Sequence, residues 1–133
     1  MSQNIESVCI IDDDSMYISL LSKIIKLKQL SETIIVFNNG REAMNFFQES
    51  ITTSSIPGVP QVIFLDLNMP IMDGWEFLNE FSKIKHQFDE KINLYVVSSS
   101  IDERDIKRVK SIAWVSNYLV KPITIDNLER LLK

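Results

Sequence analysis

Five short apolar runs alternate with five amphipathic segments, and this alternation limits the fold more than any other feature. The runs are too short for ordinary helices and rich in β-branched residues, so they predict buried strands; they cover residues 7–11, 33–37, 62–65, 92–97 and 117–120. The segments between them repeat apolar residues every three or four positions, as amphipathic helices do. They cover about 16–28, 41–49, 75–86 and 102–112, with a last helix after Thr124. We expect Ser15 and Thr124 to cap the first and last helices.

Strands that alternate with helices indicate a parallel sheet with right-handed crossovers and helices on both faces. We therefore expect an α/β, doubly wound (βα)5 domain of flavodoxin-like topology, with a five-stranded sheet in the order 2-1-3-4-5. The segment 50–60 is rich in Ser, Thr, Pro and Gly, which predicts an exposed loop. We interpret residues 1–133 as a single domain.

The segment 61–74, QVIFLDLNMPIMDG, shows how each predicted strand ends. Its apolar run stops at one carboxylate, Asp66, and the chain then turns through Pro70 and Asp73-Gly74. The first run ends the same way, at Asp12-Asp13. An apolar strand followed directly by an acid places that acid at the rim of the sheet, where a ligand can reach it.

Polar groups at four strand ends should meet, because the carboxyl ends of parallel strands share one edge. In the order 2-1-3-4-5 the first and third strands are neighbours at the switch point where ligands bind. Lys121 lies two strands away, roughly 10 Å, which its long side chain can span. The converging residues are Asp12, Asp13, Asp66, Ser98 or Ser99, and Lys121.

Three carboxylates that lie this close together at one sheet edge repel one another unless a cation neutralises their charge. An all-oxygen site with few protein ligands suits Mg²⁺, which also binds phosphate oxygens. The hydroxyl of Ser98 and the ammonium of Lys121 would add a donor and a positive charge. Phosphoryl transfer needs in-line positioning and charge neutralisation of this kind, so Asp66 is predicted to be a nucleophile that carries a phosphoryl group.

With these motifs the chain resembles a response-regulator receiver domain of two-component signalling, similar in layout to the stand-alone chemotaxis regulators. The resemblance extends over essentially the whole chain. It rests on four motifs in order: IIDDDS, the segment from Asp66 through Met69-Pro70 to Met72-Asp73-Gly74, the hydroxyl in VVSSS, and Tyr118 with Lys121-Pro122.

The resemblance implies a role for each matching residue. Asp66 stands as the phosphoacceptor. Asp13 stands as a direct metal ligand, Asp12 as one acting largely through water, and the backbone carbonyl of Asn68 as a third ligand. Ser98 is expected to contact the phosphoryl group, Lys121 to pair with it beside a cis peptide bond to Pro122, and Tyr118 to be an aromatic switch.

The segment from Ser98 to Lys121 departs from the family pattern in two ways. Ala113-Trp114 replaces small residues, and the stretch from Ser98 to Lys121 is one residue longer than usual. The choice between Ser98 and Ser99 therefore stays open, and we prefer Ser98 because it directly ends the apolar run. Asp14 is read as a rim residue rather than a ligand.

The resemblance also implies partners. A histidine kinase or phosphotransfer protein would supply the phosphoryl group, and a downstream protein would read the switch. Helix residues Arg104, Lys107, Arg108 and Lys110 form a basic stripe, which is most often a solvated face. We hypothesise that a surface of Arg104, Lys107, Arg108 and Tyr118 binds the downstream protein.

Plainer interpretations exist for several of these residues. Strand-end acids can cap loops or helices, a serine run can be turn chemistry, and Lys121 can be a solvated lysine. For Tyr118, an ordinary aromatic residue on the edge strand is nearly as good an explanation as an aromatic switch. His86 is the only histidine, and its setting among polar residues predicts a surface side chain.

Three other functions fit the sequence less well than a receiver domain does. A haloacid-dehalogenase-type phosphatase also uses a strand-end aspartate, but it needs a second acid where this chain has Asn68. A flavodoxin-like electron carrier needs a phosphate loop where this chain has three aspartates, which would repel a flavin phosphate. A receiver-like domain that binds partners without phosphorylation is disfavoured by the intact set of site residues.

Composition limits the partners and the setting expected of this protein of 133 residues. The net charge of −4, from 14 basic and 18 acidic residues, disfavours direct nucleic-acid binding. One cysteine, Cys9, allows no internal disulfide, so we expect a reducing, cytoplasmic setting. No leader-like segment or membrane-length apolar run is present, and we expect neither a membrane association nor an attached output module.

Overall fold

The computed structural model describes residues 5–52, 59–88 and 91–132. One parallel sheet holds the strands β1 (Ile5–Ile11), β2 (Ser31–Phe37), β3 (Val62–Leu65), β4 (Asn93–Ser98) and β5 (Asn117–Val120). Its order is β2-β1-β3-β4-β5, which confirms the predicted fold. Because β1 lies beside β3, with Ile11 opposite Leu65, the residues that follow these two strands meet at the same edge.

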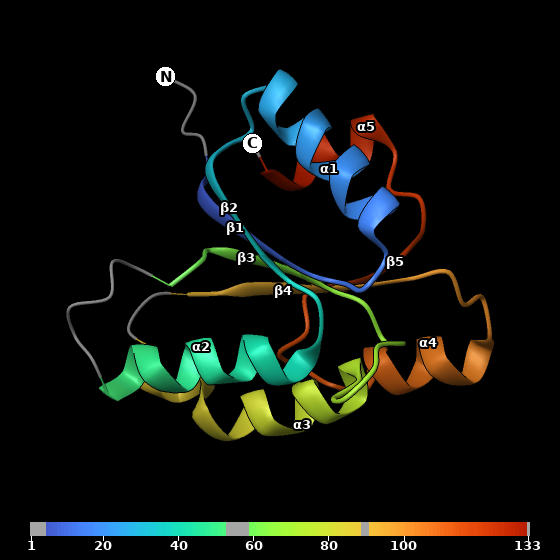
Figure 1. Cartoon of the computed structure of the whole chain (residues 1–133). Helices are drawn as coiled ribbons and strands as arrows, with labels where there is room; N and C mark the ends of the chain where they lie inside the picture. Colours follow the sequence, from blue (N-terminus) through green and yellow to red (C-terminus); the bar gives the residue numbers. More distant parts are fainter. Residues whose placement is uncertain (1–4, 53–58, 89–90, 133) are drawn as a thin grey trace.

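Helices cover both faces of the sheet (Figure 1). One face carries α1 (Ser15–Leu27) and α5 (Ile125–Leu132); the other carries α2 (Gly40–Thr52), α3 (Gly74–Ile84) and α4 (Glu103–Lys110). A short 3₁₀ helix, η1 (Lys85–Gln87), follows α3. Within the described part of the chain, no helix is both long and apolar enough to cross a membrane.

Side chains that alternate along each strand build two separate cores. On β1, Cys9 and Ile11 pack in the core toward α2, α3 and α4, whereas Val8 and Ile10 pack in the core toward α1 and α5. Strand β3 is buried at every position, because both of its faces are covered and both of its edges are paired. A central strand of this kind is apolar throughout, and the charged Asp66 can appear only after it ends.

Most predicted strands and helices are confirmed, and the differences lie at their ends. Helix α1 is capped by Asp14, not by Ser15, because the Asp14 carboxylate accepts hydrogen bonds from the backbone N–H groups of Met16 and Tyr17. The aspartate one position earlier satisfies the free donors of the first turn, and Ser15 becomes the first helical residue. At α5, Thr124 accepts from the Asn127 N–H, as expected of a cap.

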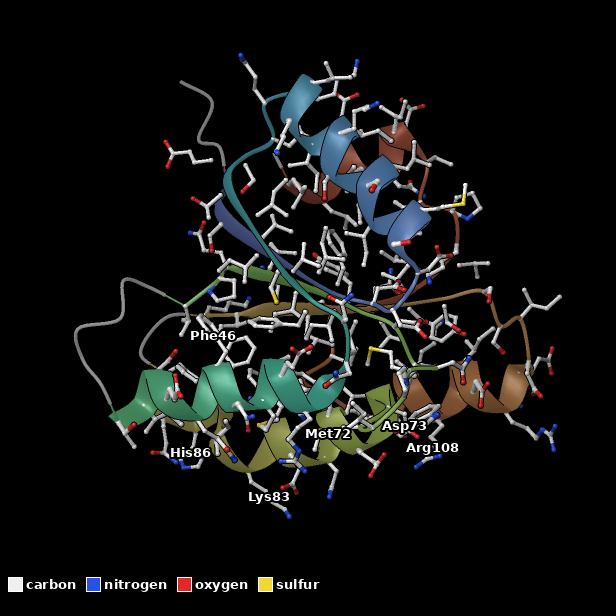
Figure 2. All side chains as sticks on the ribbon, viewed as in Figure 1. Phe46, Met72, Asp73, Lys83, His86 and Arg108 are labelled. Carbon is white, nitrogen blue, oxygen red and sulfur yellow. The ribbon has the colours of Figure 1, made fainter. Side chains whose placement is uncertain are left out.

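The predicted loop 50–60 is partly wrong. Helix α2 continues to Thr52, with the Ser50 hydroxyl hydrogen-bonded back to the Phe46 carbonyl, and residues 53–58 lie outside the described residues. Helix α4 is shorter than expected and ends at Lys110, with Ser111 as its cap. His86 is exposed on η1, as Figure 2 shows.

Candidate functional site

Three carboxylates meet at the carboxyl edge of the sheet. The backbone N–H groups of Asp12 and Asp66 continue the strand ladder, donating to the carbonyls of Phe37 and Ile11 at 3.0 and 2.9 Å. Carboxylate oxygens of Asp12, Asp13 and Asp66 lie within 4.8 Å of one another. Asp12 and Asp66 are buried and Asp13 is exposed, so one side of the cluster is open to solvent. This all-oxygen set suits a hard divalent cation.

The cluster perturbs Asp66 in particular. Burial, followed by the charge of Asp12, raises the pKa of Asp66 to about 6. The Lys121 ammonium and a hydrogen bond from the Asn68 backbone N–H oppose this rise, and Asp13 adds to it slightly. Because burial and the charge of Asp12 together outweigh Lys121 and the Asn68 hydrogen bond, a further cation in the site would stabilise the ionised Asp66 carboxylate.

Lys121 reaches the carboxylates from the far side of β4. Its ammonium lies 2.7 Å from an Asp12 oxygen and 3.7 Å from an Asp66 oxygen. The Lys121 backbone N–H donates to the Ser98 carbonyl at 2.9 Å, which holds the start of the β5–α5 loop against the end of β4. The peptide bond from Lys121 to Pro122 is cis. The ammonium therefore neutralises part of the acidic cluster.

Ser98 and Ser99 are in different environments. Ser98 ends β4 fully buried, and its hydroxyl oxygen accepts the Ser100 N–H at 3.1 Å, which leaves the hydroxyl proton available to a ligand. Ser99 is exposed. Tyr118 is 8% exposed, and its hydroxyl donates to the Ser100 carbonyl at 2.8 Å. The ring of Tyr118 thus lies inside the protein and is bonded to the β4–α4 loop.

Two glycines hold the β3–α3 loop close to Asp66. The Gly74 N–H donates to the Leu67 carbonyl at 2.9 Å, and a β-carbon on Gly74 would overlap the Asp66 carbonyl oxygen. Gly40 donates to the Met72 carbonyl at 2.9 Å, and a β-carbon there would lie 2.7 Å from that oxygen. Figure 2 shows Met72 and Asp73 in this region. The loop can approach the sheet edge only because both positions lack side chains.

The basic residues of α4 are partly engaged within the protein. Arg104 pairs with Asp102, with two side-chain contacts of 3.2 and 2.9 Å, and the Arg108 guanidinium lies 4.0 Å from the centre of the Trp75 ring. Lys107 is exposed. Together with the buried Tyr118, this arrangement presents Arg104 and Lys107 to solvent and keeps the Tyr118 ring inside.

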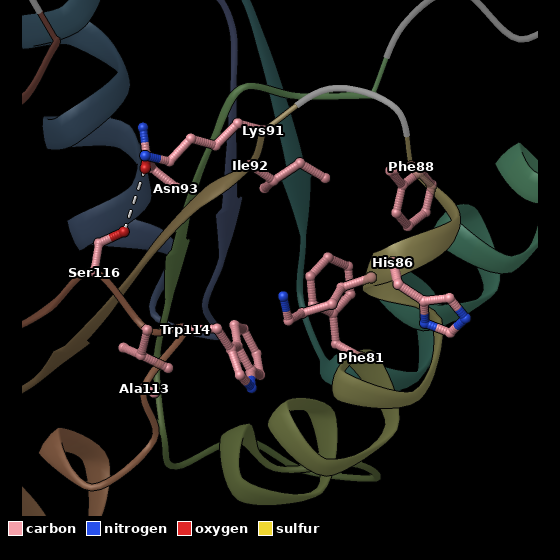
Figure 3. Close-up of a pocket in the computed structure, with 11 residues that line it drawn as sticks. Phe81, His86, Phe88, Lys91, Ile92, Asn93, Ala113, Trp114 and Ser116 are labelled. Carbon is pink, nitrogen blue, oxygen red and sulfur yellow. Dashed lines mark hydrogen bonds between the residues drawn. The ribbon is translucent and has the colours of Figure 1, made fainter.

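A hollow of about 670 Å³ lies at the opposite end of the sheet (Figure 3). It opens between the starts of β4 and β5 and the end of α3, and no residue of the carboxylate cluster lines it. Its walls include aromatic and basic side chains. The Trp114 ring in it already contacts the Phe81 ring and the Lys85 ammonium. Cavity size therefore does not locate the functional site in this protein.

Tyr17 is the residue near the site that the sequence interpretation missed. Its spacing in the first helix is that of an apolar core position, yet its ring centre lies 4.6 Å from the Lys121 ammonium. The available signal was its position in the first helical turn after the acidic strand end, where a phenol stands on an otherwise aliphatic face.

Comparison with known proteins agrees with the fold. Residues 8–133 match the family described as response regulator receiver domain. A solved two-component response regulator from Cytophaga hutchinsonii is 32% identical, with a TM-score of 0.85 over 97% of this chain and 95% of that one.

Two further proteins are similar over nearly the whole chain. The response regulator Rcp1 from Synechocystis is 28% identical over 95% of this chain and 83% of its own length. The phosphorylated cyanobacterial phytochrome response regulator RcpA is 25% identical, with a TM-score of 0.77 over 97% of this chain and 89% of that one. The chain belongs to the response regulator receiver domain family.

Proposed function

We propose that this receiver domain accepts a phosphoryl group on Asp66 from the phosphohistidine of a histidine kinase or phosphotransfer protein, and that phosphorylation changes a protein-binding surface. The observation that carries the proposal is the convergence of Asp12, Asp13 and Asp66 within 4.8 Å, with the Lys121 ammonium on the same cluster. The similarity to a response regulator described as phosphorylated, RcpA, agrees with it.

In the proposed transfer, a carboxylate oxygen of Asp66 attacks the phosphorus atom. The bond from phosphorus to the donor imidazole nitrogen breaks, and the imidazole leaves with the electron pair, so that an acyl phosphate forms on Asp66. Lys121 then pairs with one phosphoryl oxygen and the Ser98 hydroxyl donates to another. The domain catalyses only the gain and loss of its own phosphoryl group, in what we expect to be the cytoplasm.

Asp12, Asp13, Asp66 and the carbonyl of Asn68 would hold Mg²⁺. The carboxylate oxygens supply the hard ligands this ion prefers, and the open side at Asp13 leaves room for its waters. When bound, Mg²⁺ neutralises charge that builds up on the phosphoryl oxygens. The Lys121 ammonium lies closer to the Asp12 carboxylate than to that of Asp66.

The proposal is tested with a small phosphodonor. Acetyl phosphate and Mg²⁺ should add one phosphoryl group to the wild-type protein, seen in its intact mass. Asp66→Asn should add none. Asp73→Asn is the matched control, because Asp73 lies in the same loop and caps α3, and asparagine caps about as well. Addition to Asp66→Asn, or none to the wild type, would contradict the proposal.

The metal role has its own test. Asp13→Ala should lower Mg²⁺ affinity, measured by calorimetry, by about tenfold or more, because it removes one charged ligand from the cluster. Asp14→Asn is the control: Asp14 follows directly but caps α1, and it is outside the carboxylate cluster. Equal Mg²⁺ affinities for wild type and Asp13→Ala would show that Asp13 is not a ligand.

We propose that the downstream protein binds the exposed face of α4 at Arg104, Lys107 and Arg108, and that Tyr118, whose ring lies inside the protein, couples this face to the site. The Tyr118 hydroxyl donates to the Ser100 carbonyl, and the Ser100 N–H donates to the Ser98 hydroxyl oxygen. We therefore expect a phosphoryl group that engages Ser98 to alter the segment that leads into α4. Beryllium fluoride, a mimic of the phosphoryl group, should therefore change amide hydrogen exchange in residues 99–102 of the wild type. The same exchange before and after beryllium fluoride would argue against this surface as the output.

A further inference from the structure

Tyr17 carries a buried hydroxyl that nothing in the described structure satisfies. Among the described residues, two buried side-chain oxygens have no hydrogen-bond partner, those of Ser7 and Tyr17. A buried hydroxyl without a partner destabilises a protein, so its presence calls for a physical reason. Ser7 lies near the start of β1, whereas Tyr17 lies beside the carboxylate cluster.

The position of the Tyr17 ring is fixed by two contacts. The ring packs against the core between the sheet, α1 and α5. The Lys121 ammonium lies 4.6 Å from the ring centre, and the same ammonium lies 2.7 Å from Asp12 and 3.7 Å from Asp66. The ring is therefore one side chain away from both buried carboxylates.

The charges of the same two acids act on the Tyr17 phenol. The pKa of Tyr17 is raised well above its ordinary value, first by burial and then by the charges of Asp12 and Asp66. The phenol keeps its proton at any physiological pH and can only act as a neutral hydrogen-bond donor near these acids. Neither carboxylate accepts that proton in the described structure.

We propose that the Tyr17 hydroxyl is a phosphoryl-binding donor, which gains its missing acceptor when a phosphoryl oxygen occupies the space above Asp66. A tetrahedral group on Asp66 extends beyond the carboxylate and brings anionic oxygens toward the Lys121 ammonium, against which the Tyr17 ring lies. A hydrogen bond from a hydroxyl to such an oxygen is charge-assisted and stronger than a neutral one.

The inference adds a group to the set described above and rests on the proposed function. Ser98 and Lys121 would approach the phosphoryl group from the β4 and β5 side of the sheet, and Tyr17 from α1. With this donor on α1, we expect the rates at which the domain gains and loses its phosphoryl group to differ from those of a receiver that has an aliphatic residue at this position.

The experiment compares Tyr17→Phe with wild type in calorimetric titrations with beryllium fluoride in saturating Mg²⁺. Tyr17→Phe keeps the ring and its contact with Lys121 and removes the hydroxyl alone. We expect about tenfold weaker beryllium fluoride binding, the usual effect of losing one hydrogen bond to a charged group. Tyr95→Phe is the matched control: Tyr95 packs in the same core, and only burial raises its pKa.

Two further measurements separate the alternatives. Mg²⁺ binding without beryllium fluoride should be equal in Tyr17→Phe and wild type; an equal loss in both titrations would place the hydroxyl at the metal and overturn the proposal. Without ligand, Tyr17→Phe should be at least as stable as wild type toward urea. Lower stability would mean that the hydroxyl already has an acceptor inside the protein, which would also overturn it.

The outcomes distinguish this inference from the proposed function. If wild type binds beryllium fluoride with Mg²⁺ and Tyr17→Phe binds it equally well, the inference fails and the proposed function stands. If wild type does not bind beryllium fluoride at all, both fail.

Discussion

Asp66 combines a buried position with two neighbouring acids, and this combination makes the stability of the protein depend on pH. Its pKa is about 6 in the folded protein, and about 3.9 is typical of an unfolded chain. The folded state thus binds the proton more tightly. The resulting stabilisation is fully present below about pH 4 and is lost as the pH rises through about 6.

Asp66→Asn should therefore become more stable than wild type as the pH rises. In metal-free buffer we expect a difference of about 2 kcal/mol in the free energy of unfolding above pH 7, and almost none near pH 4. Urea unfolding at several pH values measures it. Saturating Mg²⁺ should remove the advantage above pH 7, because the ion neutralises the Asp66 carboxylate. A constant difference in the free energy of unfolding across the pH range would mean that folding does not raise the pKa of Asp66.

Single residues also show where sequence reasoning ends. The acids at the strand ends were predictable because each follows a run that must be core. The pairing of Lys121 with Asp12 at 2.7 Å, closer than with Asp66, was not, because it depends on side-chain conformations set across two strands. The inward position of Tyr118 likewise depends on a hydrogen bond to a loop carbonyl 18 residues away.

The β3–α3 loop is the element that places Asp66, and Gly74 is its tightest point. A β-carbon there would meet the backbone of Asp66 and Leu67, which are held by the sheet and cannot easily move. Gly74→Ala should lower the free energy of unfolding by about 2 kcal/mol, typical of overpacking, and should slow phosphorylation by acetyl phosphate. Unchanged stability and unchanged phosphorylation would show that the loop relaxes without moving Asp66.

The same loop contains a strained residue, Ile71. Its φ is 69°, and the Met72 N–H donates to the Pro70 carbonyl at 2.7 Å, so the chain makes a three-residue turn that β-branched residues disfavour. The side chain is 78% exposed and contributes little burial. Ile71→Gly should raise the free energy of unfolding by about 1 kcal/mol in urea unfolding, after the greater freedom of glycine in the unfolded chain is subtracted.

The control for Ile71 is Ile101→Gly. Ile101 is similarly exposed, at 76%, but has no positive φ, so the substitution relieves no strain and should lower stability slightly. Equal effects of the two substitutions would contradict the account of strain at Ile71.

The mispredicted starts and ends of helices depend on individual hydrogen bonds near the helix ends, which the sequence pattern does not reveal. Asp14 and Ser15 are both good helix caps, and the choice between them depends on the path of the chain as it leaves β1 beside Asp12, whose carboxylate accepts the Asp14 N–H. The end of α2 depended on local hydrogen bonds such as the one from Ser50 to Phe46, which composition does not reveal.

At the scale of the whole molecule, the fold was predictable because its signal is distributed along the whole chain. Five apolar runs and four polar strand ends specify a parallel sheet, and the order of the strands brings the ends of β1 and β3 together. Tyr17 escaped prediction because a tyrosine at helical spacing looks the same whether its hydroxyl meets solvent or is buried beside a lysine and acids. Only packing distinguishes the two.

The central claim, that Asp66 carries the phosphoryl group, is tested most directly by finding the modified residue. The protein is treated with acetyl phosphate and Mg²⁺ and then reduced with borohydride, which converts an aspartyl phosphate to homoserine, and its peptides are sequenced by mass spectrometry. The account predicts homoserine at position 66 and nowhere else. Homoserine at position 12 or 13, or unmodified aspartate at position 66 in protein that has gained a phosphoryl group, would contradict it.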